Sequence, residues 1–368
     1  MPNADARQYI HAVDLPIMSA SVDSRRAVAR RPIVLSPEQP MSAPYPLLFQ
    51  PIYKDKVWGG RALEKIGKSL PAALNIGESW ELADLDSTSV SGGGGGAAHS
   101  LITNGPLAGK PLRHAMSLWG ASLMGSARPT AHGAFPLLVK FLDARENLSV
   151  QVHPSPAYAA AHPDAHLKTE SWYILAAEPG AVIYKGVKPG VSRDTFAAHI
   201  ASNTVADDMI AIPAVPGEIH NLPSGTCHAL GAGVLVAEIQ TPSDTTFRVF
   251  DWGRMGRELH VQQALQCIDF GPAPAGARLA PGQKRGRLVT TDFYTIEEAR
   301  PAPAERVPLR VTGGPSILML LRGHGTIEAP GLEPVRVAAG NTALIPAGLT
   351  SSAVFVAASD ATLLVAGI

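Results

Sequence analysis

The sequence has little cysteine, little charge and no long apolar run. Its two cysteines, Cys227 and Cys267, form no CxxC pair and supply no disulfide framework, which predicts a protein of a reducing compartment, the cytoplasm. Charged residues make up 17% of the chain, with 31 basic and 31 acidic residues. No run of Lys or Arg is longer than two. This balance argues against a protein that binds nucleic acid mainly by neutralising phosphates.

Neither end of the chain contains a predicted membrane segment. The longest apolar stretch, 351–368, is interrupted by Ser359 and Asp360. It predicts two terminal strands, because a membrane helix needs about 20 apolar residues in a row. Residues 1–43 lack the apolar core of a signal peptide, and we expect them to form a disordered leader.

Glycine and proline are abundant. The chain contains 35 Gly and 32 Pro, which favours short strands joined by turns over long helices. Short apolar segments between 135 and 240 have the spacing of a β-sandwich or jelly roll, and a second set lies between 316 and 365. The prediction is a mainly β protein with one domain at 44–270, a linker at 271–285 and a second β domain at 286–368.

Three local patterns interrupt the predicted strands. Residues 111–124 have apolar side chains at helical spacing and predict a helix. Residues 56–61 are interpreted as a turn. The glycine tract 91–96 lacks the Gly-Lys-Ser/Thr ending of a phosphate-binding loop, and we interpret it as a flexible linker.

Four polar residues form a candidate metal site. Gln151 and His153 stand two apart in a predicted strand, so their side chains share a face. Glu170 follows after a helical or looped excursion, and His228 ends a Gly- and Pro-containing segment that bends before another strand. Two imidazoles, a carboxylate and an amide oxygen suit zinc or another divalent first-row metal and leave room for substrate or water.

Histidines in the chain also have structural interpretations. A single buried histidine is more often hydrogen-bonded in a core than bound to metal, so the metal hypothesis depends on the combination. His162 and His166 are spaced like a helical metal pair, but Pro163 interrupts the helix, and we expect solvated loop residues. His220 lines the site or fills the core, and the sequence leaves both open.

Several segments resemble a known family. Residues 217–228 fit the second cupin motif, with Gly217, Pro223, Gly225 and His228 at its fixed positions. A longer series resembles the type I mannose-6-phosphate isomerases. The matching segments are PLLVKFLDA (136–144), LSVQVHP (148–154), KTESWYIL (168–175), GTCHALGAG (225–233) and EIQTPSDTTFR (238–248). The resemblance runs from about Leu47 to the C-terminus and implies a bicupin, two jelly-roll domains, without the helical insertion of eukaryotic forms.

The resemblance implies roles for particular residues. One zinc ion per chain would be bound by Gln151, His153, Glu170 and His228. Catalytic roles would fall to Arg248, Glu238 and Lys168, and substrate contacts to Lys140, Lys168 and Arg254. Some relatives carry Lys at the last position, so a role that needs a deprotonatable amine is not expected there. The implied activity is the interconversion of mannose 6-phosphate and fructose 6-phosphate.

These residue types suit that chemistry. Interconverting an aldose and a ketose moves a proton between C1 and C2 through an enediol, which needs a Lewis acid and a base held beside carbon. Glu238 and a hydroxide held by the metal are both candidates for the base. The cations Lys140, Lys168 and Arg248 suit an anionic substrate in a chain of no net charge.

The C-terminal segment repeats the cupin turn at 340–348, but Ser351 stands where a metal-binding His would be. We therefore expect a metal-free cupin that covers one wall of the catalytic barrel.

Two other functions remain open: another sugar-phosphate isomerase or epimerase on this fold, and a non-catalytic sugar-phosphate sensor. Retention of Glu238 and Arg248 beside four ligands favours the enzyme. The expected partner is a sugar phosphate, with no nucleic acid or membrane, and we expect a monomer.

Overall fold

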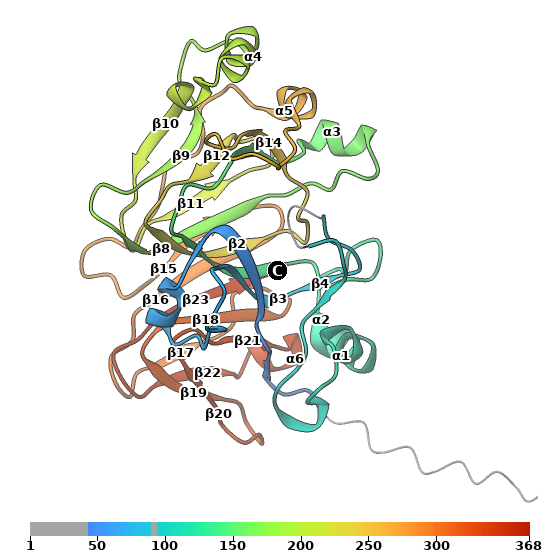
Figure 1. Ribbon diagram of the computed structural model, residues 1–368. Coiled ribbons are helices and arrows are strands. Elements are labelled where there is room, and N and C mark those ends of the chain that lie inside the picture. The colour runs from blue at the N-terminus through green and yellow to red at the C-terminus, as the bar shows by residue number, and fades with distance from the viewer. Residues whose placement is uncertain (1–42, 90–93) are drawn as a thin grey trace, which may run out of the picture. The chain divides into compact units, whose positions relative to one another are not determined.

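The computed structural model describes residues 43–89 and 94–368, and in these ranges the chain is mainly β, as predicted (Figure 1). Residues 1–42 of the expected leader and residues 91–93 of the glycine tract lie outside the described residues. No helix in the described ranges is long and apolar enough to cross a membrane.

Two antiparallel sheets form the first β-sandwich. The five-stranded sheet runs in the order β10 (Met209–Pro213), β9 (Val182–Val187), β12 (His228–Leu230), β7 (Val150–Val152), β14 (Phe247–Phe250). The six-stranded sheet runs in the order β11 (Ile219–Leu222), β8 (Glu170–Ala177), β13 (Val234–Gln240), β6 (Leu138–Ala144), β3 (Ile76–Leu82), β2 (Ile52–Gly60). Neighbours in these sheets are mostly distant in sequence, which is the topology of a jelly roll.

Two further sheets hold the C-terminal strands. One runs β1 (Leu47–Leu48), β21 (Thr342–Ile345), β18 (Ser316–Arg322), β23 (Thr362–Gly367), β16 (Thr295–Ala299), β15 (Arg285–Thr290). The other runs β17 (Arg306–Pro308), β22 (Val354–Ala357), β19 (His324–Glu328), β20 (Val335–Ala338). β1 pairs with β21, so the start of the described chain completes a sheet made otherwise of C-terminal strands. A small pair, β4 (Asp84–Leu85) and β5 (Ala98–His99), stands apart.

Helices are short and lie between strands. They are α1 (Leu112–Trp119), α2 (Ala121–Met124), α3 (Pro156–Ala161), α4 (Arg193–Ala201), α5 (Val261–Cys267) and α6 (Ala347–Thr350), with 3₁₀ turns at Ala62–Ile66, Gly105–Leu107 and Val205–Asp208. The helix predicted at 111–124 is broken into α1 and α2, because Gly120 has φ 46°, a conformation that ends a right-handed helix. His162 and His166 are exposed and follow α3, as expected for loop residues.

The turn predicted at 56–61 is wrong. These residues belong mostly to β2, which continues to Gly60. Register shifts at Lys54/Asp55 and Asp55/Gly60 absorb the irregular pairing with β3, so a bulged edge strand forms where the sequence pattern indicates a turn. This correction matters for function, because Lys56 and Trp58 of β2 line the main cavity.

The six-stranded sheet of the first sandwich is buried on both faces. β3, β6 and β13 have no exposed residue along their length. One face lines the cavity described below, and residues of the other, including Phe141, Tyr173 and Ile239, share a hydrophobic cluster with Ile296 and Ile317 of the C-terminal strands. Double burial explains why β6 and β13 are mostly apolar instead of alternating, whereas β3 carries Glu78, Ser79 and Glu81.

Candidate active site

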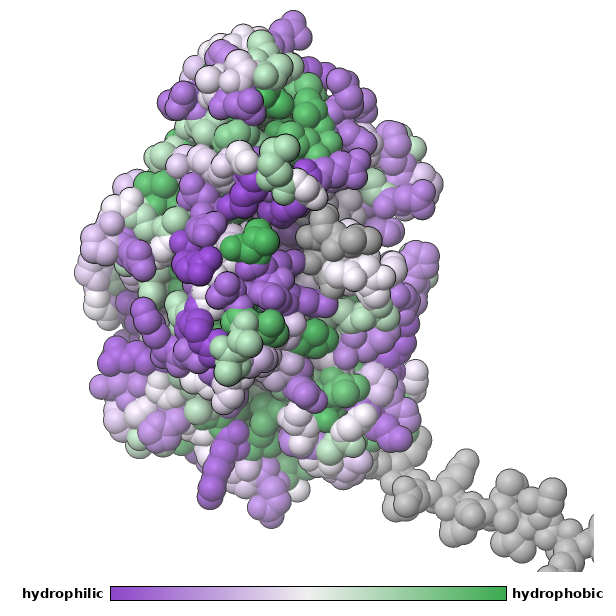
Figure 2. Space-filling view, viewed as in Figure 1, coloured by the Kyte–Doolittle hydropathy of each residue, from purple (hydrophilic) through white to green (hydrophobic). Residues whose placement is uncertain are grey.

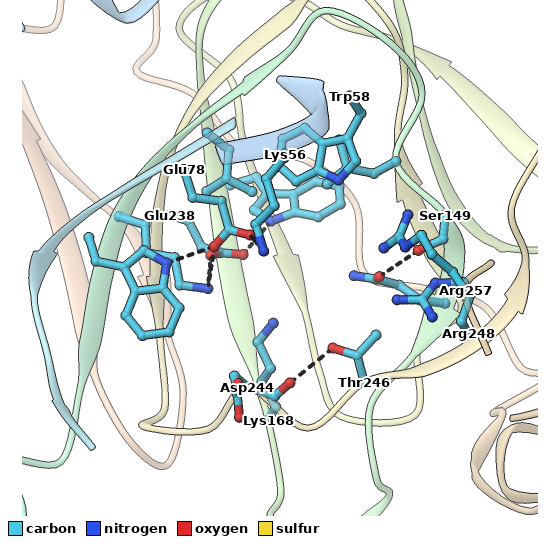
Figure 3. A pocket seen from close by; sticks show the side chains of 16 residues that line it. Lys56, Trp58, Glu78, Ser149, Lys168, Glu238, Asp244, Thr246, Arg248 and Arg257 are labelled. Atoms are coloured by element: carbon cyan, nitrogen blue, oxygen red, sulfur yellow. Dashed lines mark hydrogen bonds and ion pairs between the residues drawn. The ribbon is translucent and has the colours of Figure 1, made fainter. Parts of the chain in front are cut away.

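Facing rows of side chains from the two sheets of the first sandwich line one cavity (Figure 3). In the five-stranded sheet, Arg248 pairs with Gln151, and Gln151 pairs with His228. In the six-stranded sheet, the row across neighbouring strands is Trp80, Lys140, Glu238 and Trp172. Directly opposed residues of antiparallel strands point to the same side, so each row places its polar groups toward the space between the sheets.

A compact group of metal-type ligands adjoins this cavity. His153, Glu170 and His228 each offer an atom within 4.8 Å of the others, and all three side chains are buried. Gln151 Nε2 lies 3.4 Å from His228 Nε2, and Lys168 Nζ lies 2.8 Å from Glu170 Oε2. Since Gln151 and Lys168 also line the cavity, they connect the group to it.

Local structure fixes where each ligand stands. Gln151 lies on β7, and His153 follows directly after that strand. Glu170 opens β8, and His228 opens β12 after a turn at Gly225, whose φ is 94°. A side chain at Gly225 would be strained by that backbone conformation, so the bend that introduces His228 needs glycine.

The histidine rings are held in one tautomer. Nδ1 of His153 lies 2.9 Å from the Thr245 carbonyl, and Nδ1 of His228 lies 2.7 Å from the Thr226 carbonyl. A carbonyl oxygen only accepts, so Nδ1 carries the proton in both rings and Nε2 of the neutral ring carries a lone pair. Burial lowers the pKa of His153 to about 3, which keeps that ring neutral.

The group fits a divalent cation. The two Nε2 atoms face the Glu170 carboxylate at 3.3 and 3.1 Å, where lone pairs would meet a negative charge. His153 Nε2 and Glu170 Oε1 are buried and have no hydrogen-bond partner in the described part of the chain, and Glu170 Oε2 has only the Lys168 ammonium beside it. A cation between them would satisfy all of these atoms, and carbonyl partners on Nδ1 are what metal-binding histidines usually have.

Lys140 lies between two carboxylates whose pKa values are shifted in opposite directions. Its Nζ lies 3.4 Å from Glu78 Oε2 and 3.3 Å from Glu238 Oε2. Burial raises the pKa of Glu238; Lys140 opposes this rise, and the nearby Glu170 adds to it. Burial would also raise the pKa of Glu78, but Lys56, Lys140 and a hydrogen bond from Trp80 hold it below its ordinary value. Glu78 therefore stays ionised, whereas Glu238 is poised to exchange a proton.

Arg248 is a buried guanidinium in the cavity wall. Its side chain is 2% exposed, Nη1 donates to the Glu258 carbonyl at 2.7 Å, and Nε has no hydrogen-bond partner in the described ranges. Burial, followed by repulsion from Arg257, lowers the pKa of Arg248 to about 10. The side chain therefore retains donors and positive charge for another group in the cavity.

The structure brings most of the sequence-predicted residues together. Gln151, Lys140, Lys168, Glu238 and Arg248 line the cavity, and the remaining metal-type ligands adjoin it. Arg254 is not among the lining residues: its guanidinium donates to Asp251 and to the Asn147 carbonyl. Arg257, three residues later, lines the cavity instead.

Comparison with known proteins identifies the family. Residues 47–182 match the model of the type I phosphomannose isomerase catalytic domain. A mannose-6-phosphate isomerase of Streptococcus mutans is 33% identical over 315 residues, which span 82% of this chain and 92% of the relative. The chain belongs to the type I phosphomannose isomerase family.

Solved structures agree with this membership. The mannose 6-phosphate isomerase from Bacillus subtilis superposes with a TM-score of 0.74 at 27% identity, covering 88% of this chain and 99% of that one. A zinc-bound holo mannose 6-phosphate isomerase gives a TM-score of 0.66 at 16% identity over 87% and 98% of the two chains, a likeness of fold. The two-sandwich architecture is thus that of phosphomannose isomerase structures.

Sequence reasoning missed part of this family's cavity in the present chain. The unforeseen lining residues include Lys56, Trp58, Glu78, Trp80, Asp244 and Arg257. A usable signal existed for Glu78 and Trp80, because they stand two residues apart and a strand at this point places both side chains on one face. For Arg257 no periodicity was available, because it lies in the irregular segment between β14 and α5.

In Figure 2, hydrophilic residues gather in the middle of the viewed face, where β2, β3 and β4 lie in Figure 1.

Proposed function

We propose that this protein interconverts mannose 6-phosphate and fructose 6-phosphate by moving a proton between C1 and C2 through an enediol. The observation that carries the proposal is the juxtaposition of Glu238, a buried carboxylate of raised pKa, with the ligand group around Glu170. A base beside a Lewis-acid site is what aldose–ketose isomerisation requires. Family membership supports the same reaction.

The proposed cofactor is one zinc ion per chain, held by Gln151, His153, Glu170 and His228. The two imidazole nitrogens in the donor set and the zinc of the holo structural neighbour support this choice over magnesium or calcium, which prefer oxygen ligands. When bound, zinc supplies a Lewis acid that stabilises negative charge on the sugar oxygens during enediol formation.

Glu238 is the proposed proton-transferring base. Trp172 Nε1 donates to its Oε1 at 2.9 Å, and Lys140 Nζ lies 3.3 Å from its Oε2, so both carboxylate oxygens are oriented. The raised pKa lets the group accept a proton from carbon and return it to the neighbouring carbon. The ionised Glu78 serves a different purpose, holding Lys56 and Lys140 in place by ion pairs.

The cations have graded proposed roles. Arg248, buried and with an unused Nε, stabilises the charge that develops on the enediol oxygens. Lys168 acts between Glu170 and the cavity, where it contacts substrate and neutralises the carboxylate. Lys140 binds substrate and orients Glu238.

We further propose that residues 44–270 carry the chemistry, that 286–368 form a metal-free cupin, and that the protein is a cytoplasmic monomer. Both cysteines are free and buried, which supports a reducing compartment. The interior between the two C-terminal sheets is an apolar cluster that includes Leu318, Phe355 and Leu363, which supports the absence of a metal there.

A coupled assay tests the main proposal. Purified, zinc-loaded protein is supplied with mannose 6-phosphate or glucose 6-phosphate, and formation of fructose 6-phosphate is followed. We expect turnover with mannose 6-phosphate and little with its C2 epimer. Turnover only with another sugar phosphate would indicate a different isomerase or epimerase. Tight binding of mannose 6-phosphate without any turnover would indicate a sensor.

A further inference from the structure

Arg257 lines the cavity, whereas Arg254, for which the family resemblance predicted a substrate contact, does not. It lines the same wall as Arg248 and Ser149, and all three appear on one side of the cavity in Figure 3. The residue lies in the irregular segment that follows β14. It therefore meets the cavity from a loop, not from the strand that carries Arg248.

Arg254 and Arg257 differ in how many of their guanidinium nitrogens already have a partner within the protein. All three Arg254 nitrogens have partners: Nε and Nη2 donate to Asp251, Nη2 also donates to the Asn147 carbonyl, and Nη1 lies 3.8 Å from Glu146. In the described part of the chain, Arg257 donates only through Nη1, to the two Asp251 oxygens at 3.0 and 3.2 Å. Its Nε and Nη2 remain as donors for a group in the cavity.

Charge at this wall is unbalanced. Asp251 is a single carboxylate shared by Arg254 and Arg257, and it is 4% exposed. Arg248 forms no ion pair within 4.0 Å among the described residues, and its Nη1 partner is a neutral carbonyl. Among the described residues, the three guanidinium groups thus have two carboxylates within 4.0 Å, Asp251 and Glu146, and Glu146 contacts Arg254 alone. A doubly charged phosphate would balance the remaining positive charge beside Arg248 and Arg257.

The exposed fraction of the side chains distinguishes the inner end of the site from its outer end. The side chains of His153 and Glu170 are 1% exposed, and that of Arg257 is 23% exposed. An open-chain hexose 6-phosphate has its reacting carbons and its phosphate at opposite ends. With C1 and C2 beside the metal-type ligands, the phosphate would lie outward, toward the rim where Arg257 stands.

We propose that Arg257 binds the phosphate of the substrate through Nε and Nη2, with Asp251 orienting its guanidinium, and so sets the preference for phosphorylated over free sugars. The inference rests on the proposed function, since it assigns the phosphate contact of that same site. Arg254 has a different role, because it holds Asp251 and the loop around Asn147 in place.

Calorimetric titration of the zinc-loaded protein with mannitol 6-phosphate, which has no carbonyl to isomerise, measures this contact without turnover. Mannitol is the matched ligand without phosphate. Arg257→Ala is expected to weaken mannitol 6-phosphate binding about 10- to 100-fold and to leave mannitol binding unchanged, because a charge-assisted contact is lost. Arg254→Ala removes the other partner of Asp251 and should change the Kd less than about threefold.

Steady-state kinetics with mannose 6-phosphate provide the second readout. Arg257→Ala should raise KM strongly and lower kcat little, because the phosphate contact is the same in ground and transition states. If Arg257→Ala does not fold, Arg257→Gln keeps much of the volume and decides the question by the same two measurements.

Three results would overturn the inference: a Kd within about threefold of the parent for the Arg257 variant, an equal loss in Arg254→Ala, or a fall in kcat at unchanged KM. Failure of the proposed function looks different. A parent that does not isomerise mannose 6-phosphate but binds mannitol 6-phosphate in an Arg257-dependent way would retain the phosphate contact and reject the isomerase.

Discussion

Nε2 of His228 lies 3.1 Å from Oε1 of Glu170, and with the ring in its neutral form neither atom has a proton to place between them. The Thr226 carbonyl holds the ring proton on Nδ1, on the far side of the imidazole. Burial would raise the pKa of Glu170, but the charge of Lys168 holds it well below its ordinary value, so the carboxylate is ionised. Close approach of a lone pair and an anion is stable only with a cation between them.

The first prediction concerns that cation. His153→Ala should lose metal and activity together, because one of two imidazoles is removed from the ligand group. Metal content per chain after zinc supplementation, measured by elemental analysis, should fall from one ion to well below one. His162→Ala, at an exposed residue after α3, is the control and should keep its ion.

The same measurement tests the C-terminal domain. Ser351 is exposed at the end of α6, and the cluster between the two C-terminal sheets that includes Leu318, Phe355 and Leu363 is apolar. A His153→Ala, His228→Ala double variant should therefore bind no zinc. Stoichiometric ion in this variant would place a metal site outside the proposed group.

Glu238→Gln is predicted to lower kcat by about 100-fold or more while metal content stays unchanged, because the amide cannot accept a proton from carbon. Glu78→Gln is the matched control on the other side of Lys140. Its carboxylate has a lowered pKa and serves in ion pairs, so the loss of rate should be smaller. Equal losses in both variants would assign Glu238 to charge balance and leave another group as the base.

Arg248→Ala should reduce kcat by about 100-fold with a much smaller change in KM, because its charge acts on negative charge that develops in the transition state. The side chain is buried, so thermal unfolding of the variant must be measured alongside its kinetics. A saturated rate within about threefold of the parent, under 1 kcal/mol of barrier, would reject the catalytic role. Lower stability with normal kinetics of the folded fraction would make Arg248 structural.

His220 should make stability depend on pH. Burial, with repulsion from Lys185, lowers its pKa to about 4, and the ring nitrogens have no hydrogen-bond partner in the described ranges. Between pH 6.5 and 4 the unfolded chain therefore binds a proton that the native state does not, and stability falls as pH falls.

Urea unfolding at two pH values measures this effect. His220→Leu should make the loss of stability between about pH 7 and pH 5 smaller by about 2 kcal/mol than in the parent. Comparing the two pH values cancels the packing cost of the substitution. His162→Leu, at an exposed position, should leave the loss unchanged. An unaltered pH dependence in His220→Leu would mean that His220 titrates normally.

The sequence predicted the regular strands well because their signal is local. β13, β18 and β21 fall within the two stretches predicted to hold short strands, since each is a short apolar segment between turn residues. β2 was missed because bulges break the alternation of its side chains. Residues 111–124 were predicted as one helix because the spacing of apolar residues carries no information about the positive φ of Gly120. The pairing of β1 with β21 joins residues almost 300 positions apart, and no local pattern encodes it.

The sequence by itself determined the mainly β fold, the family and the set of residues that could bind metal, because residue type and spacing along a strand already decide which side chains share a face. Tertiary structure alone decided which partner each group meets. Lys140 between Glu78 and Glu238 is one case, since opposite effects on two similar carboxylates arise from burial and from charges on neighbouring strands. The second case is that Arg257, and not Arg254, lines the cavity. Only the folded loop shows that the Arg254 donors are already used by Asp251 and the Asn147 carbonyl, whereas Arg257 donates to Asp251 through Nη1 alone.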